Sequence, residues 1–281
     1  SQEYLDTWLA NNADRPFNLE QGDIIRAHVL NRYPQTDSVG EGECILLLVA
    51  HHIGVDFWSF DILIDDLCLL YQRMEEGNSM PLPALTTNYR DYVRREQDKL
   101  ASPEIKEQWD YWQQKLAGEL PVLNLPTDKP RPPLQTYNGV SHYFTLNEEL
   151  SQKIRQLAKK TGSTAYSLIL TAFQVLLSRY TSQEELAIGC PMAGRIDPEL
   201  EKIVGYFVNP VVLRGNLAGN PRFEELIPQV RQTLLEALDY QELPFPLLVK
   251  KLQPERDPSR SPLFQAALVS DRSRQNHNTE V

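Results

Sequence analysis

The feature that most constrains this chain is an apolar run followed by a short polar turn and an amphipathic segment. Residues 45–50 are all apolar, the letters HHIGVD occupy residues 51–56, and large apolar residues recur at helical spacing through residues 57–77. This order predicts a buried central strand over residues 43–50, then a turn, then a helix that Gly77 ends. His51, His52 and Asp56 are therefore expected where a strand ends, a position that commonly carries chemistry in layered α/β folds.

Strand-like and helix-like segments alternate along the rest of the chain, which predicts α/β or α+β layers. Prolines are dense over residues 121–133, where they exclude regular helix and central strand and indicate a semi-rigid linker. We expect an N-terminal part over residues 1–125, a linker over residues 126–138 and a C-terminal part over residues 139–281. Helices are predicted over residues 87–100, 102–116, 147–162, 164–180 and 224–239 (Pro228 in the first turn of the last), and strands over residues 140–146, 185–189, 206–214 and 263–269.

Composition excludes several classes of function. The net charge of −10 argues against nonspecific binding of nucleic acid, which needs a basic surface. The three cysteines have no paired spacing that predicts a zinc site or a disulfide framework. No apolar run reaches the roughly 18 residues of a membrane span, and we expect no secretory leader. We therefore expect a cytoplasmic protein with neither a nucleic-acid nor a membrane partner.

The histidine pair leaves two interpretations open. Adjacent residues in a strand point to opposite faces, so His51 and His52 are not expected to share one target, and no third metal ligand stands nearby. No G-x-S-x-G elbow predicts a serine nucleophile. One histidine is then a general base or polar positioning group, or it is a hydrogen-bonded core residue. Asp56 can accept N–H bonds at the helix start or pair with a buried arginine, for which Arg195 is the candidate.

The motifs of this chain resemble those of condensation domains in nonribosomal peptide synthetases. Residues 51–56 resemble the HHxxxDG signature of that family, with His52 at the position to which the family assigns catalysis. Four more segments resemble its YxDF/Y, (I/V)GxFVNT…R, (H/N)QDxPFE and RDxSRNPL motifs in the same order, at residues 88–92, 203–214, 240–245 and 256–263. The resemblance implies two lobes similar to chloramphenicol acetyltransferase, set as a V around a tunnel. Two upstream motifs and the last stretch of the family are absent, so both lobes are expected to be partial and the chain to be an internal fragment.

The resemblance also implies an activity. An acyl or peptidyl thioester on one carrier protein is joined to the amine of an aminoacyl group on a second carrier, beside an adenylation domain. No cofactor is expected to bind directly, because phosphopantetheine arms on the carriers present both substrates. The resemblance implies catalysis by His52 and supporting roles for His51, Asp56 and Arg195. Residues expected to line the tunnel or contact substrate are Gly54, Phe57, Trp58, Ser59 and Asn209.

The chain departs from the family pattern at four positions. Phe57 replaces the glycine of HHxxxDG, Pro210 replaces the threonine of FVNT, and Tyr240 and Glu242 stand in the fourth motif. These departures leave open whether a polyketide or a peptide module lies upstream. An epimerisation domain of the same superfamily and a non-catalytic docking module or inactive remnant stay open as alternatives. A heterocyclisation domain is disfavoured, because it carries aspartate where His51 and His52 stand.

Overall fold

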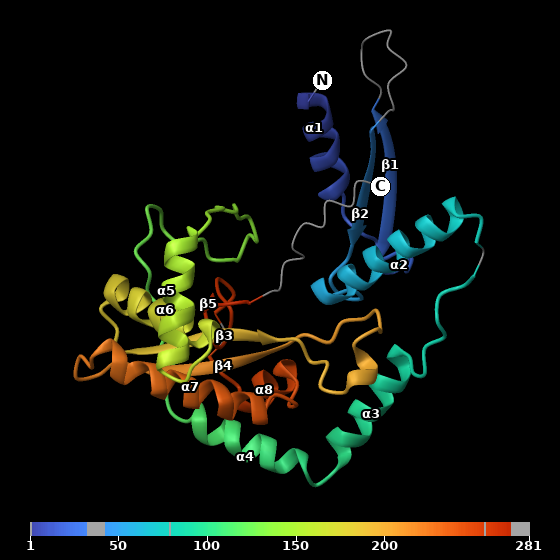
Figure 1. The fold of residues 1–281 in the computed structure, drawn as a ribbon. Helices are drawn as coiled ribbons and strands as arrows, with labels where there is room; N and C mark the ends of the chain where they lie inside the picture. The colour runs from blue at the N-terminus through green and yellow to red at the C-terminus, as the bar shows by residue number, and fades with distance from the viewer. Residues whose placement is uncertain (1, 33–42, 79, 256, 271–281) are drawn as a thin grey trace. The chain divides into compact units, whose positions relative to one another are not determined.

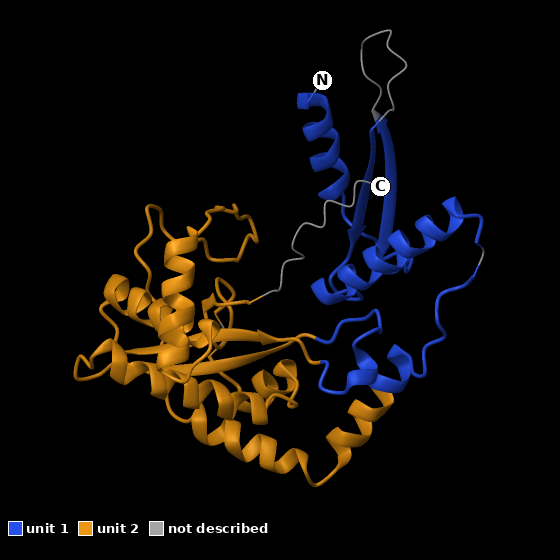
Figure 2. Cartoon of the chain, in the orientation of Figure 1, with its two compact units in different colours: residues 1–92, 195–207 blue, residues 93–194, 208–281 orange. Residues whose placement is uncertain are grey.

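The computed structural model describes residues 2–32, 43–78, 80–255 and 257–270 (Figure 1). The chain divides into two compact units, of which unit 1 comprises Ser1–Tyr92 with Arg195–Phe207 and unit 2 comprises Val93–Gly194 with Val208–Val281 (Figure 2). These units divide the chain at other positions than the expected boundaries at residues 125 and 139, which remain a prediction. Within the described residues, no helix combines the length and the apolar character that a membrane span needs.

Unit 1 is built from a hairpin and the helices that follow or precede it. Helix α1 (Gln2–Ala13) comes first, and strands β1 (Ile25–Arg32) and β2 (Glu43–Ala50) pair antiparallel, with Ile25 opposite Ala50. Helix α2 (Phe57–Glu75) begins after a turn, and Gly77 beyond its end has a φ of 69°, a left-handed conformation that glycine adopts freely. The unit also holds the start of α3 (Tyr89–Ala101) and a short 3-10 helix (Pro198–Leu200).

Unit 2 is a three-stranded sheet covered by helices. Strand β3 (Glu185–Met192) pairs antiparallel with β4 (Asn209–Asn216) and parallel with the short β5 (Ala266–Ala267). The helices of this unit, besides most of α3, are α4 (Ile105–Lys115), α5 (Glu148–Lys160), α6 (Ala165–Thr181), α7 (Phe223–Asp239) and α8 (Phe245–Leu252).

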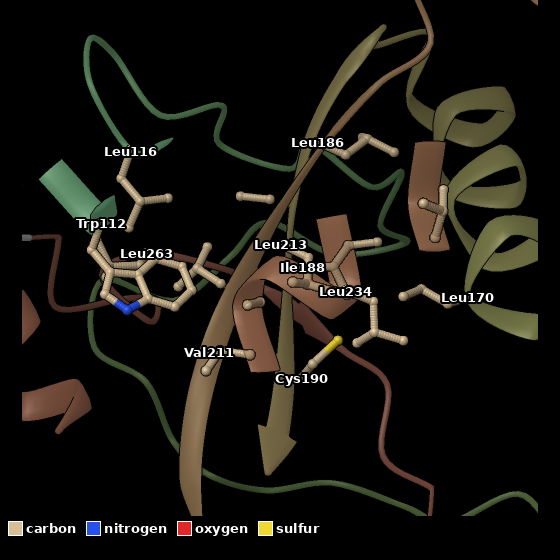
Figure 3. Close-up of a cluster of buried hydrophobic side chains, with 14 of the residues drawn as sticks. Trp112, Leu116, Leu170, Leu186, Ile188, Cys190, Val211, Leu213, Leu234 and Leu263 are labelled. Carbon is tan, nitrogen blue, oxygen red and sulfur yellow. The ribbon is translucent and has the colours of Figure 1, made fainter. Parts of the chain in front are cut away.

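The main hydrophobic core lies in unit 2. Five consecutive residues of β3, 186–190, are buried, so both faces of this strand are covered. Figure 3 shows Trp112 of α4 and Leu116, the residue after that helix, on one side of the strands and Leu170 of α6 on the other. Gly189 is required here because a Cβ would overlap the ring of Phe264, which packs against the strand.

Most elements predicted from the sequence are present, with small shifts of their ends. The strand over residues 43–50 and the helices over residues 147–162, 164–180 and 224–239 are confirmed. Helix α4 begins at Ile105 rather than at residue 102, because the backbone N–H and the hydroxyl of Ser102 both donate to the carbonyl of Lys99 and so end α3. Pro228 lies in the second turn of α7 rather than the first. The predicted strand over residues 263–269 shrinks to Ala266–Ala267.

Two strand predictions are wrong in a way that has a physical cause. Residues 140–146 form no strand, and Val140 is 97% exposed. Residues with high β propensity adopt a stable strand only beside a partner, and within the described chain this segment has none. Strand β2 exists, but within the same residues it pairs only with β1 and none of its side chains is fully buried, so it is not a buried central strand.

The proline-rich segment is irregular, as its composition predicts, and hydrogen bonds to residues 258–265 hold it. The Leu123 N–H donates to Gln265 Oε1 over 2.7 Å, and the Gln135 N–H donates to the carbonyl of Pro258 over 3.0 Å. Arg131 donates to the carbonyl of Ser259. The RDxSRNPL-like motif therefore anchors this segment, although Arg256, its first residue, lies outside the described residues.

Candidate active site

Asp56 starts helix α2 by capping it. Its backbone is extended (φ −92°, ψ 174°), and its Oδ1 accepts from the Ser59 N–H over 2.8 Å. This bond satisfies one of the N–H groups that have no partner within the helix. Asp56 therefore determines where the turn after β2 ends and where α2 begins.

The predicted pairing of Asp56 with Arg195 is present. Arg195 Nη1 donates to Asp56 Oδ2 over 2.6 Å, and Arg195 Nη2 donates to Asp56 Oδ1 over 3.1 Å. Both side chains are almost fully buried, with 1% of Arg195 and 0% of Asp56 exposed. A two-bond pair between a guanidinium and a carboxylate is the strong geometry for a buried ion pair.

The ion pair is embedded in a network that includes residues 203–207. Arg195 Nη2 donates to the carbonyl of Ile203 over 3.1 Å, and the Phe207 N–H donates to Asp56 Oδ2 over 3.2 Å. Ser59 Oγ lies 2.7 Å from Asp56 Oδ1 and accepts from the N–H of Gly205. The network thus joins the start of α2 to a segment that is distant in the sequence.

The charge of Asp56 is maintained in spite of its burial. Desolvation raises the pKa of this carboxyl, but hydrogen bonds from Arg195 and Ser59, together with the positive charge of Arg195, outweigh it and bring the pKa below its ordinary value of 3.8. Asp56 is therefore ionised near neutral pH, as the partner of a buried guanidinium. It is poorly suited to exchange protons with a substrate.

The guanidinium of Arg195 also lies over aromatic rings. Its central carbon is 4.1 Å from the ring centre of Phe207 and 5.6 Å from that of Trp58. Arg195 Nε is buried and has no hydrogen-bond partner within the residues that the structure describes. The contact with the ring faces offsets part of the cost of burying this charge.

His52 is exposed and lies in the turn between β2 and α2. The strand ends at Ala50, and the Gly54 N–H donates to the carbonyl of His51 over 3.1 Å to close a turn. His52 Nδ1 lies 2.9 Å from the carbonyl oxygen of Val55. The expectation that the two histidines alternate across a strand is therefore wrong, because both lie beyond its last residue.

The other predicted site residues of unit 1 have different surroundings. His51 is half-buried, and its Nδ1 accepts from the Ile53 N–H over 3.0 Å. Trp58 donates from Nε1 to the carbonyl of Glu201. Gly54 is half-buried against Ile24, and a Cβ at this position would overlap the Ile24 side chain.

Two further predicted residues lie at the start of α2. Phe57 is 68% exposed, and its ring contacts that of His52 edge to face. Ser59 is fully buried in the ion-pair network. Contact of these residues with a substrate stays a prediction.

Asn209 lies in unit 2 and is engaged with the segment that resembles (H/N)QDxPFE. Its Nδ2 donates to the carbonyls of Gln241 and Leu243 over 2.8 and 2.9 Å, and its Oδ1 accepts from the Phe245 N–H over 2.8 Å. These bonds use both N–H donors of the amide. Asn209 thus holds the segment that leads into α8, and its predicted contact with substrate remains untested.

Tyr206, which lies beside His52, and Tyr89, which bonds to Tyr206, were not identified from the sequence. The ring of Tyr206 lies edge to face with the imidazole, with centroids 5.3 Å apart, and the hydroxyl of Tyr89 donates to the carbonyl of Tyr206 over 2.8 Å. Both residues belong to motifs that carry the family resemblance, and this membership was the signal from which they could have been identified. These contacts could not be predicted because no local pattern relates the three segments.

Other sites for metal or small molecules do not coincide with these residues. Among the described residues, no group of three or more histidines, cysteines or acids is arranged to hold a metal ion. A cavity of about 510 Å³ in unit 2 is lined by residues of α6, α7 and the loops beside them, including Arg179, Ser182 and Asn220. None of the site residues predicted from the sequence lines it, so it is not part of the candidate active site.

Comparisons with known proteins agree with this arrangement of motifs. The family model described as "Condensation domain" matches residues 1–280. A linear gramicidin synthase from Brevibacillus parabrevis is 40% identical over 255 residues, which are 91% of this chain and 5% of that protein. The X-domain from teicoplanin biosynthesis has a TM-score of 0.83 and 26% identity, with 95% of this chain and 59% of that chain covered. The same X-domain in a complex with OxyB gives a TM-score of 0.82 at 25% identity, with 94% and 58% covered.

The chain therefore belongs to the condensation domain family of nonribosomal peptide synthetases. The match to solved members of the family also confirms the predicted mixed α/β fold class. The chain spans only a small part of the gramicidin synthase and somewhat more than half of the X-domain chain.

Proposed function

We propose that this chain carries the active site for amide-bond formation between two carrier-bound substrates. The donor is an acyl or peptidyl thioester, and the acceptor is the amine of an aminoacyl thioester. The observation that carries the proposal is the His52 imidazole, which is exposed and has one nitrogen bonded to the Val55 carbonyl. It lies in the turn that ends at Asp56, which the buried pair with Arg195 holds in place.

The hydrogen bond of His52 determines which nitrogen can accept a proton. A carbonyl oxygen only accepts, so the bond to Val55 requires the hydrogen on Nδ1. In the neutral ring the lone pair is then on Nε2. In the proposed reaction, Nε2 takes the proton from the acceptor amine.

The proposed reaction needs no activating nucleotide, because the thioester is already activated. The amine nitrogen attacks the thioester carbonyl carbon, and a C–N bond forms in a tetrahedral oxyanion. The amine proton passes to His52 Nε2, the C–S bond breaks, and the thiolate leaves and recovers the proton. The oxyanion collapses to the amide carbonyl, so atoms and charge balance.

The proposed partners follow from this reaction. Two carrier proteins would present the substrates on phosphopantetheine arms, and an adenylation domain would load the acceptor carrier. Holding both arms in place can contribute more than proton transfer, since effective molarities reach roughly 10⁵ M and above. We place this chemistry in the cytoplasm, where loaded carrier proteins are made.

The direct test is an assay with two loaded carrier proteins. One carrier holds a labelled acyl thioester, the second holds an aminoacyl thioester, and the amide on the second carrier is measured by mass spectrometry. The assay is run with the 281-residue chain and with any longer polypeptide that contains it. We expect transfer of the label to the acceptor carrier. No amide with either protein, while both carriers stay loaded, would contradict the proposal.

A second candidate function is a docking module that binds a partner protein without catalysis. The likeness to the teicoplanin X-domain, whose complex with OxyB is known, favours it. Binding of a loaded carrier without amide formation would support this candidate.

An epimerisation domain would instead invert the α-carbon of a single carrier-bound residue. Chiral analysis of the amino acid recovered from the same reaction detects this inversion.

A further inference from the structure

The imidazole of His52 has few contacts that determine its orientation. One hydrogen bond, to the Val55 carbonyl, leaves the ring free to tilt about that bond. Two aromatic rings touch it edge to face, Phe57 with centroids 5.7 Å apart and Tyr206 with centroids 5.3 Å apart. Edge-to-face contact is the favourable arrangement between such rings. The two rings therefore also hold the imidazole.

The two rings differ in how firmly they are themselves held. Phe57 is 68% exposed and is the first residue of α2, so it directly follows the loop that contains His52. Tyr206 is 37% exposed and belongs to a segment that reaches the site from elsewhere in the chain. A ring on such a segment positions the imidazole only if its own backbone is fixed.

The backbone around Tyr206 is fixed at three consecutive residues. The carbonyl of Gly205 accepts from the Asp56 N–H over 3.1 Å, and the Phe207 N–H donates to Asp56 Oδ2 over 3.2 Å. Between them, the carbonyl of Tyr206 accepts from the Tyr89 hydroxyl over 2.8 Å. The segment is thus tied to the residue that caps α2 and to the first residue of α3.

Close packing adds to these bonds. A Cβ at Gly205 would overlap the ring of Tyr89, so only glycine lets that ring lie against the segment. The rings of Tyr89 and Tyr92 both contact Phe207, with centroids 5.2 and 4.6 Å away. These contacts restrict the direction in which the Tyr206 side chain leaves the backbone.

We infer that Tyr206 is a positioning residue that holds the His52 imidazole through its ring, and that Tyr89 positions Tyr206 through the bond to its carbonyl. The inference rests on the proposed function for its effect on rate, but the contact itself can be tested without catalysis. The ring of Tyr206, rather than its hydroxyl, carries the effect. Tyr206→Phe therefore keeps the function, and Tyr206→Leu loses it.

The first test measures the reactivity of His52 and needs no condensation activity. Diethyl pyrocarbonate modifies accessible neutral imidazoles, and peptide mass spectrometry gives the rate at His52 in the folded chain. We expect Tyr206→Leu to raise this rate roughly three- to tenfold, the factor equivalent to one lost ring contact. Tyr206→Phe should leave it unchanged, and Tyr89→Phe should raise it by a smaller factor. Tyr180→Leu, an exposed tyrosine of unit 2, is the matched control.

The second test is a double-mutant comparison in the carrier-protein assay. We expect Tyr206→Leu to lower kcat roughly three- to tenfold with KM unchanged, and Tyr206→Phe to restore it. Combined with His52→Ala, Tyr206→Leu should cause no further loss, because it acts through that imidazole. Three results would overturn the inference. In the carrier-protein assay, these are a further three- to tenfold loss of kcat in the double variant, or a lowered kcat in Tyr206→Phe. In the modification experiment, it is an unchanged rate at His52 in Tyr206→Leu. If the wild-type chain forms no amide, that result contradicts the proposed function but not this inference. The modification rates at His52 would still decide the inference.

Discussion

At the scale of residues, His52 and Asp56 stand only four positions apart and have opposite surroundings. His52 is exposed with one hydrogen bond, whereas Asp56 is 1% exposed and accepts from Arg195, Ser59 and Phe207. An exposed group with few contacts contributes little to folding and is available to a substrate. A buried charge with a full set of partners contributes to folding and is not available. Substitutions at the two positions should therefore affect different measurements.

His52→Ala is expected to lower the rate of amide formation by about 10²–10⁴-fold, the range of general acid–base catalysis. The midpoint of urea unfolding should hardly change, because the side chain is exposed. His51→Ala is the matched control, since His51 accepts a backbone N–H within the same turn and should lose less activity. Full activity of the His52→Ala variant in the carrier-protein assay would refute its catalytic role.

Asp56→Asn is expected to lower the free energy of unfolding at pH 7 by about 3–5 kcal/mol, because it leaves the buried guanidinium of Arg195 without its counter-charge. The measurement is chemical denaturation followed by circular dichroism. Asp128→Asn, at an exposed carboxylate, should change the free energy of unfolding by less than about 0.5 kcal/mol. A soluble Asp56→Asn variant of wild-type stability would contradict the structural role of this residue.

The same pair predicts how stability depends on pH. The folded-state pKa of Asp56 is below 3.8, so the unfolded chain takes up the proton first as pH falls. The stabilisation from Asp56 is therefore complete above that value and is lost as pH falls through the lower folded-state pKa. The difference in unfolding free energy between wild type and Asp56→Asn should shrink below about pH 3.8 and stay constant from pH 5 to pH 7.

At the scale of elements, the starts of α5 and α6 agree with the sequence prediction, whereas α4 begins at Ile105 rather than at residue 102. Asn147, which caps α5, accepts from the Leu150 N–H over 2.9 Å, and Thr164, which caps α6, accepts from the Ser167 N–H over 3.1 Å. A cap depends on a polar side chain and the next three residues, which are visible in the sequence. Residues 140–146 failed as a strand because a strand needs a partner that no local pattern supplies.

Thr164→Ala is expected to lower the free energy of unfolding by about 0.5–2 kcal/mol, the usual cost of removing a helix cap. The change should appear as a lower urea midpoint with an unchanged slope. Thr233→Ala within α7 makes the same chemical change without removing a cap, and we expect it to be neutral or slightly stabilising. Equal losses in both variants would contradict the role of the cap.

At the scale of the whole molecule, the large core belongs to unit 2 and the candidate active site to unit 1. The core is built on β3, β4 and the helices that cover them, and it contains none of the site residues predicted from the sequence (Figure 3). The ion-pair network of Asp56 and Arg195 lies within unit 1, although its residues come from two separate segments of the chain. Core substitutions in unit 2 should consequently be detected first as losses of stability.

Leu170→Ala is expected to cost about 2–5 kcal/mol of unfolding free energy, because Leu170 is fully buried in α6 and its removal leaves a cavity. Leu176→Ala in the same helix, where the side chain is 51% exposed, should cost much less. Guanidinium denaturation of the two variants measures the difference. Similar midpoints for both would show that α6 is packed differently from the structure described.

The sequence alone determined the family, the position of Asp56 at the start of a helix, and Arg195 as the candidate partner of Asp56. These features depend on residue types at short spacing or on whole motifs, and both can be read along one chain. The tertiary structure alone decided that Tyr206 adjoins His52 and is held by Tyr89, that Asn209 holds residues 241–245, and that both histidines lie beyond the strand. Such contacts join segments whose approach depends on how the whole chain packs, and no local spacing records it.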